Sequence, residues 1–318
     1  MRSERRLGGA LSLPPKVVMG GSAGAGRWGA GPTDLRWIVM MELPLVLEPD
    51  RDDPDCAAVC VDGSAEGRRR RFLVDTGAAV TQVPRAWLAH GSTSQGERTG
   101  EAALGSAHQH LAQLDSLRVG SLEMRKATVG VLAEEHPHPW GLLGMDVLGR
   151  EAWQFDFAER RIGMGSVGSD ADRPWLSLDR YPAGQPLVEM SIGPVPATAV
   201  WDSGAGITLV DAGFQHRHAE LFVPAGSATG RDSGGNQAQT PLAVMAASRI
   251  ADVDFPPCKV AVVDLGHATA ALDRPMDLIL GYTLIRSAVW TFDFPRQRWV
   301  VAPAGLDSSA AGGVKRRT

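Results

Sequence analysis

Two copies of a short acidic motif constrain this chain more than any other feature. The first copy is LVDTGAAVT at residues 73–81, and the second is VWDSGAGIT at residues 200–208. In both, two apolar or aromatic residues precede Asp, and a hydroxyl residue, Gly and Ala follow it, with Thr three residues after that Ala. A chain that repeats a segment in this way is expected to contain two related folding units.

The segments around each motif repeat in the same order. Two short apolar runs separated by a turn precede each copy, which predicts a strand, a turn and a second strand ending at the Asp. Downstream, Leu-Gly is followed nine residues after the Gly by Trp, from Gly144 to Trp153 and from Gly281 to Trp290. The tripeptide FDF, a turn and an Arg-containing strand follow in both. We interpret this as an internal duplication, with short helices after each motif and each Leu-Gly.

The length of 318 residues and a composition of 44% hydrophobic and 21% charged residues fit a globular protein with two lobes. Numerous Gly and Pro and alternating short apolar runs predict a mostly β chain with many turns. The expected order is a disordered segment (1–35), a first lobe (36–166), a linker (167–182), a second lobe (183–304) and a disordered tail (305–318). Alternatively, the first segment precedes a true start at Met40 or Met41.

Composition argues against several classes of function. The net charge of −4 favours neither nucleic-acid nor membrane binding, and no run of eighteen apolar residues predicts a transmembrane helix. Three cysteines form neither a disulfide framework nor a zinc motif: Cys56, Cys60 and Cys258. The apolar stretch after the basic N-terminus is interrupted at Pro14, so it is a poor signal peptide. We therefore expect a cytoplasmic protein.

The duplicated motifs resemble those of pepsin-like and retroviral-type aspartic proteases, in which Asp-Thr/Ser-Gly-Ala precedes two apolar residues and Gly by some seventy residues. The resemblance covers roughly residues 40 to 303 as an arrangement of motifs. The matching pieces are Asp75-Thr76-Gly77-Ala78, Leu142-Leu143-Gly144, Asp202-Ser203-Gly204-Ala205 and Ile279-Leu280-Gly281. The resemblance implies a mostly all-β, bilobal fold with two duplicated β-barrel-like lobes and short helices.

The chemistry of peptide hydrolysis gives a reason for the duplication. Hydrolysis by carboxylates needs two of them in one site sharing one proton, one as general base on a water and the other polarising or protonating the substrate. The resemblance assigns these roles to Asp75 and Asp202, whose pKa values are expected to split. Because one chain carries both, we expect a monomer that cleaves an extended peptide or protein segment without metal or organic cofactor.

The neighbours of the two aspartates are expected to support them. Each Gly after the hydroxyl residue lets the backbone turn tightly and aim its N–H at a carboxylate. The resemblance implies that the paired hydroxyls hydrogen-bond across the lobe interface, and the apolar-apolar-Gly segments are expected to pack beneath the turns. These residues are Thr76, Gly77, Ser203, Gly204, Leu142, Leu143, Gly144, Ile279, Leu280 and Gly281.

Ala78 and Ala205 stand where many pepsin-like enzymes carry Ser or Thr. A hydroxyl there donates to the catalytic carboxylate, and Ala cannot. Because the loss of a hydrogen bond to the charged form raises the pKa of a carboxylate, we expect a working pH nearer neutral than that of gastric-type enzymes.

A protease of this class also needs a flap over its cleft. The candidates lie near Gly105 and near Gly234 and Gly235. The Tyr of the pepsin flap is missing, since the two tyrosines of the chain, Tyr181 and Tyr282, lie in neither segment. Two flaps of the retroviral type are therefore favoured over one.

Two other readings remain open. A pepsin-fold peptide-binding or scaffold protein that has lost hydrolysis is the main alternative, although an inactive lobe often loses its Asp. A β-rich structural protein would leave the paired motifs unexplained. The histidine pairs HQH, HPH and HRH share no carboxylate or cysteine partner, so no metal site is expected.

Overall fold

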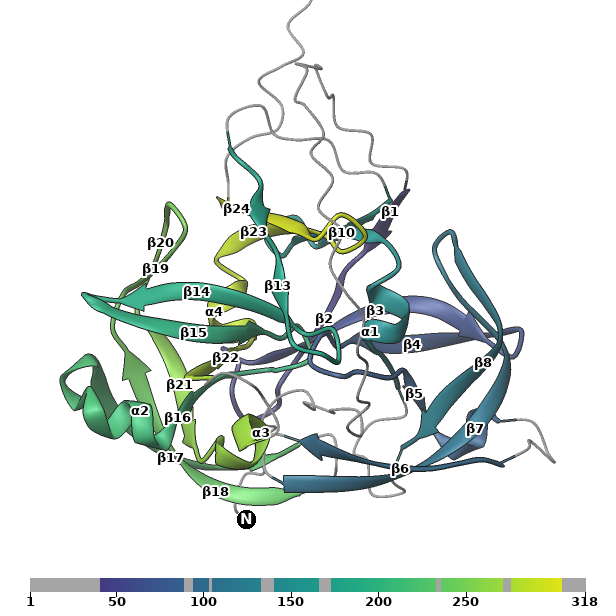
Figure 1. Cartoon of the computed structure of the whole chain (residues 1–318), viewed down its shortest axis with the longest axis horizontal. Helices are drawn as coiled ribbons and strands as arrows, with labels where there is room; N and C mark the ends of the chain where they lie inside the picture. The colour runs from purple at the N-terminus through teal and green to yellow at the C-terminus, as the bar shows by residue number, and fades with distance from the viewer. Residues whose placement is uncertain are drawn as a thin grey trace, which may run out of the picture.

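The computed structural model describes residues 41–88, 94–102, 105–132, 140–165, 173–232, 236–270 and 276–304. This part of the chain is mostly β-structure, in three sheets with short helices (Figure 1). Within these ranges, no helix has the length and apolar character that a membrane span needs.

The first sheet consists of strands from the first half of the chain. They are β2 (Val46–Pro49), β3 (Ala57–Ala65), β4 (Arg68–Val74), β5 (Gln82–Val83), β6 (Ser94–Ala102), β7 (Gly105–Val119), β8 (Leu122–Val131) and β9 (Gly141–Leu143). Their order is β2-β3-β4-β9-β5-β8-β7-β6. Neighbours are antiparallel except in the parallel pairs β4–β9 and β5–β8. The arginine run RRRR forms the start of β4.

The second sheet consists of strands from the second half. They are β13 (Asp179–Arg180), β14 (Pro186–Ile192), β15 (Val195–Trp201), β16 (Thr208–Asp211), β17 (Phe222–Arg231), β18 (Gln237–Met245), β19 (Ser248–Ile250), β20 (Val253–Phe255), β21 (Cys258–Val263) and β22 (Leu278–Leu280). The run β14-β15-β22-β16-β21-β18-β17 follows the same order as β3-β4-β9-β5-β8-β7-β6 in the first sheet. Its parallel pairs, β15–β22 and β16–β21, fall at the same places.

The third sheet joins the two halves and lies above the other sheets in Figure 1. It contains β1 (Met41–Pro44), β10 (Ala152–Asp156), β11 (Arg161–Met164), β12 (Leu176–Ser177), β23 (Ala288–Asp293) and β24 (Arg298–Pro303), in the order β1-β11-β10-β23-β24-β12. The two FDF segments lie in the hairpins β10–β11 and β23–β24, which pair with each other through β10 and β23. Each hairpin thereby satisfies the edge hydrogen bonds of the other.

The helices are short and follow the motifs. They are the 3-10 turns η1 (Arg85–Trp87) and η2 (Ala219–Leu221) and the helices α1 (Met145–Leu148), α2 (Ala212–Arg217), α3 (Gly266–Ala270) and α4 (Tyr282–Ile285). As expected, η1 and α2 come after the acidic motifs, and α1 and α4 come after Leu-Gly. The side chain of Asp211 accepts from the Phe214 N–H at 2.9 Å and so caps α2.

The repeated tryptophans bind the ends of the two helices that follow Leu-Gly. The indole N–H of Trp153 donates to the Leu148 carbonyl of α1, and that of Trp290 donates to the Ile285 carbonyl of α4, both at 2.8 Å. The last carbonyls of a helix lack partners within it, so these bonds satisfy groups that burial would otherwise penalise. The nine-residue spacing from Gly to Trp therefore positions a C-terminal cap.

The core beneath the second acidic motif is aromatic. Trp201, the residue before Asp202, is fully buried. Its ring centroid lies 4.7 Å from that of Phe292 and 4.9 Å from that of Phe155, which belong to the third sheet. This packing fixes the end of β15 against strands from both halves of the chain.

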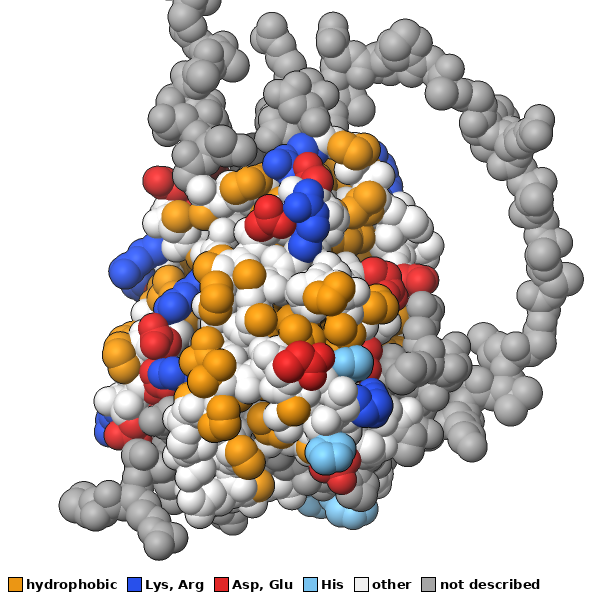
Figure 2. All heavy atoms as spheres, turned by 90° about the vertical axis from the view of Figure 1, so that its left-hand side faces the viewer, with side chains coloured by type: hydrophobic (Ala, Val, Ile, Leu, Met, Phe, Trp, Pro, Cys, Tyr) orange, Lys and Arg blue, Asp and Glu red, His pale blue; other side chains and the backbone are white. Residues whose placement is uncertain are grey.

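The outer side of the second sheet is mixed in character. Figure 2, which shows this side of the molecule, has hydrophobic and charged side chains interspersed. Val223 and Val244 are the exposed large hydrophobic residues of the described chain, and they are direct cross-strand partners in β17 and β18. A pair of this size is an ordinary surface feature.

Candidate active site

Asp75 and Asp202 occupy corresponding places, directly after β4 and β15. The N–H of Asp75 donates to the Leu143 carbonyl and that of Asp202 to the Leu280 carbonyl, both at 3.0 Å. Each turn is thus hydrogen-bonded to the strand that pairs in parallel with the strand preceding the turn: β9 beside β4, and β22 beside β15. Neither aspartate has exposed surface. The two strands therefore place two carboxyl groups in the interior, where burial of a carboxyl costs free energy unless hydrogen bonds offset it.

The hydroxyls of Thr76 and Ser203 cross between the two halves. Thr76 Oγ1 donates to the Trp201 carbonyl at 2.9 Å, and Ser203 Oγ donates to the Val74 carbonyl at 2.7 Å. Each hydroxyl also accepts from the backbone N–H of the other residue, at 3.1 and 3.3 Å. Each of these four hydrogen bonds joins one half of the chain to the other, so together they fix the position of the two turns relative to each other.

Gly77 and Gly204 are required by close approach. A Cβ on Gly77 would lie 2.5 Å from Asp202 Oδ2, and one on Gly204 would lie 2.5 Å from Asp75 Cγ. Neither residue has a positive φ angle. The sequence-based reason, a tight turn, is therefore incomplete, because each glycine leaves room for the carboxylate of the opposite half.

Beneath the turns, the Thr that ends each acidic motif holds the Gly of the downstream Leu-Gly. Thr81 Oγ1 accepts from the Gly144 N–H at 3.0 Å, and Thr208 Oγ1 accepts from the Gly281 N–H at 3.1 Å. A Cβ on Gly144 would lie 2.5 Å from the Val80 carbonyl carbon, so side chains are excluded there. The apolar residues expected under the turns are buried: Leu142, Leu143, Ile279 and Leu280. The two threonines are part of the repeat in the sequence, but sequence reasoning assigned them no role.

The two carboxylates receive unequal hydrogen bonding. Oδ1 of Asp202 accepts from the Gly77 N–H at 3.1 Å and the Gly204 N–H at 2.9 Å. Oδ1 of Asp75 accepts from the Ala78 N–H at 2.9 Å. Oδ2 of both aspartates is buried and takes no hydrogen bond from a described donor outside the pair. These two oxygens are the ones available for a shared proton or a reactant.

Burial raises the pKa of both carboxyls. It raises that of Asp202 to about 6, against the opposing effect of the backbone N–H groups of Gly204 and Gly77. Burial and then the charge of Asp202 raise the pKa of Asp75 well above its ordinary value. Ala78 and Ala205 are fully buried and add no hydroxyl donor that would lower either pKa. Because both carboxyls are buried and the charge of Asp202 raises the pKa of Asp75, the pair favours one shared proton, which suits acid–base chemistry.

Gln185 is a site residue that sequence reasoning missed. Its side chain is buried, and Nε2 donates to the Gly77 carbonyl at 3.1 Å. In strand register its counterpart is Ala58, because Leu187 pairs with Val200 as Cys60 pairs with Leu73. A comparison of the two copies could not find Gln185, since the first copy has no polar residue there.

The structure describes only part of the expected flaps. Gly105 begins β7 in the β6–β7 hairpin, which lies against α3 from the second half (Figure 1). Gly234 and Gly235 lie outside the described residues, so that flap stays a prediction. Within the described ranges, no group of three or more His, Cys, Asp or Glu side chains could hold a metal ion.

Residues 61–150 match the family model described as "gag-polyprotein putative aspartyl protease". This segment runs from β3 to the end of α1 and includes Asp75 and Gly144, but not Asp202. The segment is therefore similar to the retropepsin-like aspartyl protease domain. Members of that family are hydrolases. A comparison of the whole chain with curated proteins found no match.

Proposed function

We propose that the chain is a single-chain aspartic endopeptidase whose dyad is Asp75 and Asp202. The proposal extends the match of residues 61–150 to an aspartyl protease family. The observation that carries the proposal is the crossed contact between the motifs: the Gly77 N–H donates to Asp202, and Gly204 lies against Asp75. The family match supplies one Asp turn. The second turn comes from the same chain and completes a pair that a single turn cannot form.

The proposal includes two duplicated lobes, one around each of the first two sheets. It is supported by the identical strand order of the two sheets and by the parallel pairs at the same places. The third sheet would then join the lobes in the manner of a subunit interface built into one chain. A monomer would suffice for activity.

In the proposed reaction, ionised Asp202 takes a proton from a water molecule, whose oxygen attacks the carbon of the peptide carbonyl. Protonated Asp75 gives its proton to the carbonyl oxygen, so a neutral tetrahedral diol forms. When the C–N bond breaks, Asp202 gives its proton to the leaving nitrogen, and Asp75 takes a proton from a diol hydroxyl. The products are a carboxylic acid and an amine, and the starting protonation state of the pair returns.

The test is cleavage of a broad peptide library by wild type and by the Asp75→Asn and Asp202→Asn variants. Asn keeps the shape of Asp but cannot act as base or acid, so neither variant is expected to cut. Asp254→Asn is the matched control, because Asp254 is exposed on β20 and pairs with Arg249; it should cut like wild type. Equal cleavage by all four proteins would remove the dyad. Folded wild type that binds peptides without cutting them would favour the scaffold alternative.

A further inference from the structure

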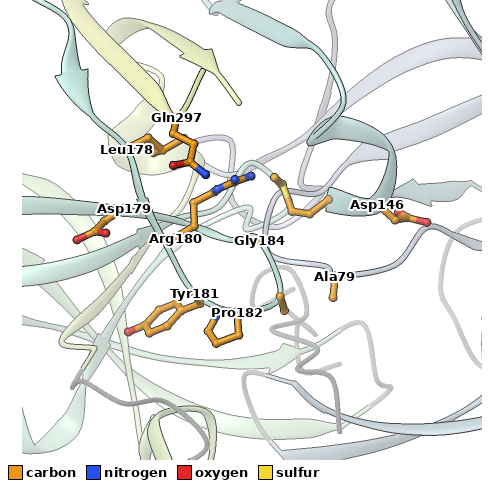
Figure 3. Close-up of a pocket in the computed structure, with 11 residues that line it drawn as sticks. Ala79, Asp146, Leu178, Asp179, Arg180, Tyr181, Pro182, Gly184 and Gln297 are labelled. Carbon is orange, nitrogen blue, oxygen red and sulfur yellow. The ribbon is translucent and has the colours of Figure 1, made fainter. Parts of the chain in front are cut away.

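A cavity of about 470 Å³ lies beside the first acidic turn, between the chain that leads into the second sheet and helix α1. Its walls include Ala79, Met145, Arg180, Gly184 and Gln297 (Figure 3). The walls combine both halves of the chain, since Ala79 and Met145 come from the first half and the others from the second.

The cavity shares its walls with the dyad. Ala79 follows Ala78, whose N–H donates to Asp75 Oδ1 at 2.9 Å, and the Met145 N–H donates to the Ala78 carbonyl at 2.8 Å. On the other wall, Gly184 precedes Gln185, whose side chain binds the Gly77 carbonyl. A peptide that passes the dyad would therefore reach this cavity within a few residues of the scissile bond.

The cavity contains the cationic side chain of Arg180. Arg180 is half-buried, and its guanidinium makes no hydrogen bond or ion pair with the residues that the structure describes. Most other arginines at this level of burial are paired, as Arg71 is with Asp62 and Glu48. In Figure 3, the side-chain amide of Gln297 faces the guanidinium of Arg180.

The nearby carboxylates do not neutralise this charge. Asp146 also lines the cavity, but its Oδ1 accepts from both the N–H and the hydroxyl of Thr81, each at 2.8 Å. Figure 3 shows the carboxylates of Asp146 and Asp179 pointing away from the guanidinium. An arginine fork with an adjacent amide donor is suited to a carboxylate.

We propose that this cavity is an outer subsite of the substrate cleft that takes an acidic side chain of the peptide, with Arg180 as its cationic partner and Gln297 as a second donor. The inference rests on the proposed function and names the substrate class for it: peptides with Asp or Glu a few residues from the cleaved bond. On the other side, Ala57 lies against Gly206 of the second turn, and the segment before it carries Asp53 and Asp55, which pair with Lys259 and Arg286. The preference would therefore apply to one side only.

The test uses pairs of peptides that differ by Glu against Gln at one position, with that position moved along the peptide. Wild type is expected to cleave the Glu peptide with about tenfold higher kcat/KM at one position, as for a charge-assisted hydrogen bond. Arg180→Met should bring this ratio close to one, and Arg180→Glu should favour Lys at that position. Arg249→Met, which removes an exposed arginine of β19, is the control and should keep the wild-type ratio.

The outcomes separate this inference from the proposed function. A wild-type ratio near one at every position, or an unchanged ratio in Arg180→Met, would overturn the subsite and leave the protease proposal intact. Wild type that cuts no peptide would contradict the protease. In that case binding of the same fluorescent peptide pairs decides the subsite: a preference for Glu that Arg180→Met loses supports it, and equal binding overturns it.

Discussion

The backbone N–H of Gly77 donates to Oδ1 of Asp202, 3.1 Å away in the other half of the chain. The glycine of one turn thus stabilises the charged form of the carboxylate in the other turn. The two motifs form a single structure, in which a change to one side alters the electrostatics of both.

Gly77→Ala is expected to abolish this arrangement. The new Cβ would lie 2.5 Å from Asp202 Oδ2, so the carboxylate must move. A displacement of about 1 Å in a catalytic group can lower a rate by about 10²-fold, and we expect a fall in kcat of that order. Gly206→Ala is the control, because a Cβ on Gly206 would lie 3.4 Å from its nearest neighbour, the Ala57 carbonyl oxygen. The first motif also has Ala at the same place. Equal kcat in both variants would contradict the close contact.

Ser203→Ala should weaken the joint between the halves. It removes the donor to the Val74 carbonyl and the acceptor of the Thr76 N–H, and both groups are buried. An unsatisfied buried group costs about 1–3 kcal/mol, so the free energy of unfolding should fall by at least that amount in urea titrations. Ser227→Ala removes an exposed hydroxyl that binds Gln239 and should change stability by less than about 0.5 kcal/mol. Similar losses in the two variants would argue against the crossed bonds.

The pH dependence of cleavage follows from the two raised pKa values. Activity needs Asp202 ionised, so kcat/KM should rise with pH through about 6. It also needs Asp75 protonated, so kcat/KM should fall at higher pH, when Asp75 loses a proton that burial and the charge of Asp202 help it to keep. The expected profile is a bell with its maximum above about pH 6. A maximum below about pH 3, where ordinary carboxyls are already protonated, would contradict it.

Trp290→Phe should destabilise the second half. Phe keeps most of the aromatic contact but cannot donate to the Ile285 carbonyl, and it leaves a small void in a fully buried position. We expect a loss of roughly 1–3 kcal/mol in the free energy of unfolding. Trp175→Phe is the control, because Trp175 is only partly buried and stacks under Arg298, a contact that Phe can keep. Thermal unfolding of the two variants would distinguish them, and equal melting temperatures would count against the cap.

The features that the duplication encodes were predictable from the sequence. Asp75 and Asp202, the crossed hydroxyls and the helices after Leu-Gly each occur twice, so each copy supported the other. The pairing of β10 with β23 was not predictable, because any edge strand could pair with several others and only the packing of both halves decides which. Gln185 and Arg180 were missed for a different reason. Each stands in the second half and has no counterpart with the same chemistry in the first.

That lack of a counterpart gives the candidate site a direction. An enzyme assembled from two identical subunits must present the same groups on both sides of its dyad. A peptide therefore meets the same surroundings in either of the two directions in which it can bind. Here Gln185 lies on one side and Ala58 occupies the corresponding strand position on the other. In the proposed single-chain enzyme the two sides are encoded separately, so mutation would be free to alter the recognition of residues before the cleaved bond without altering that of residues after it.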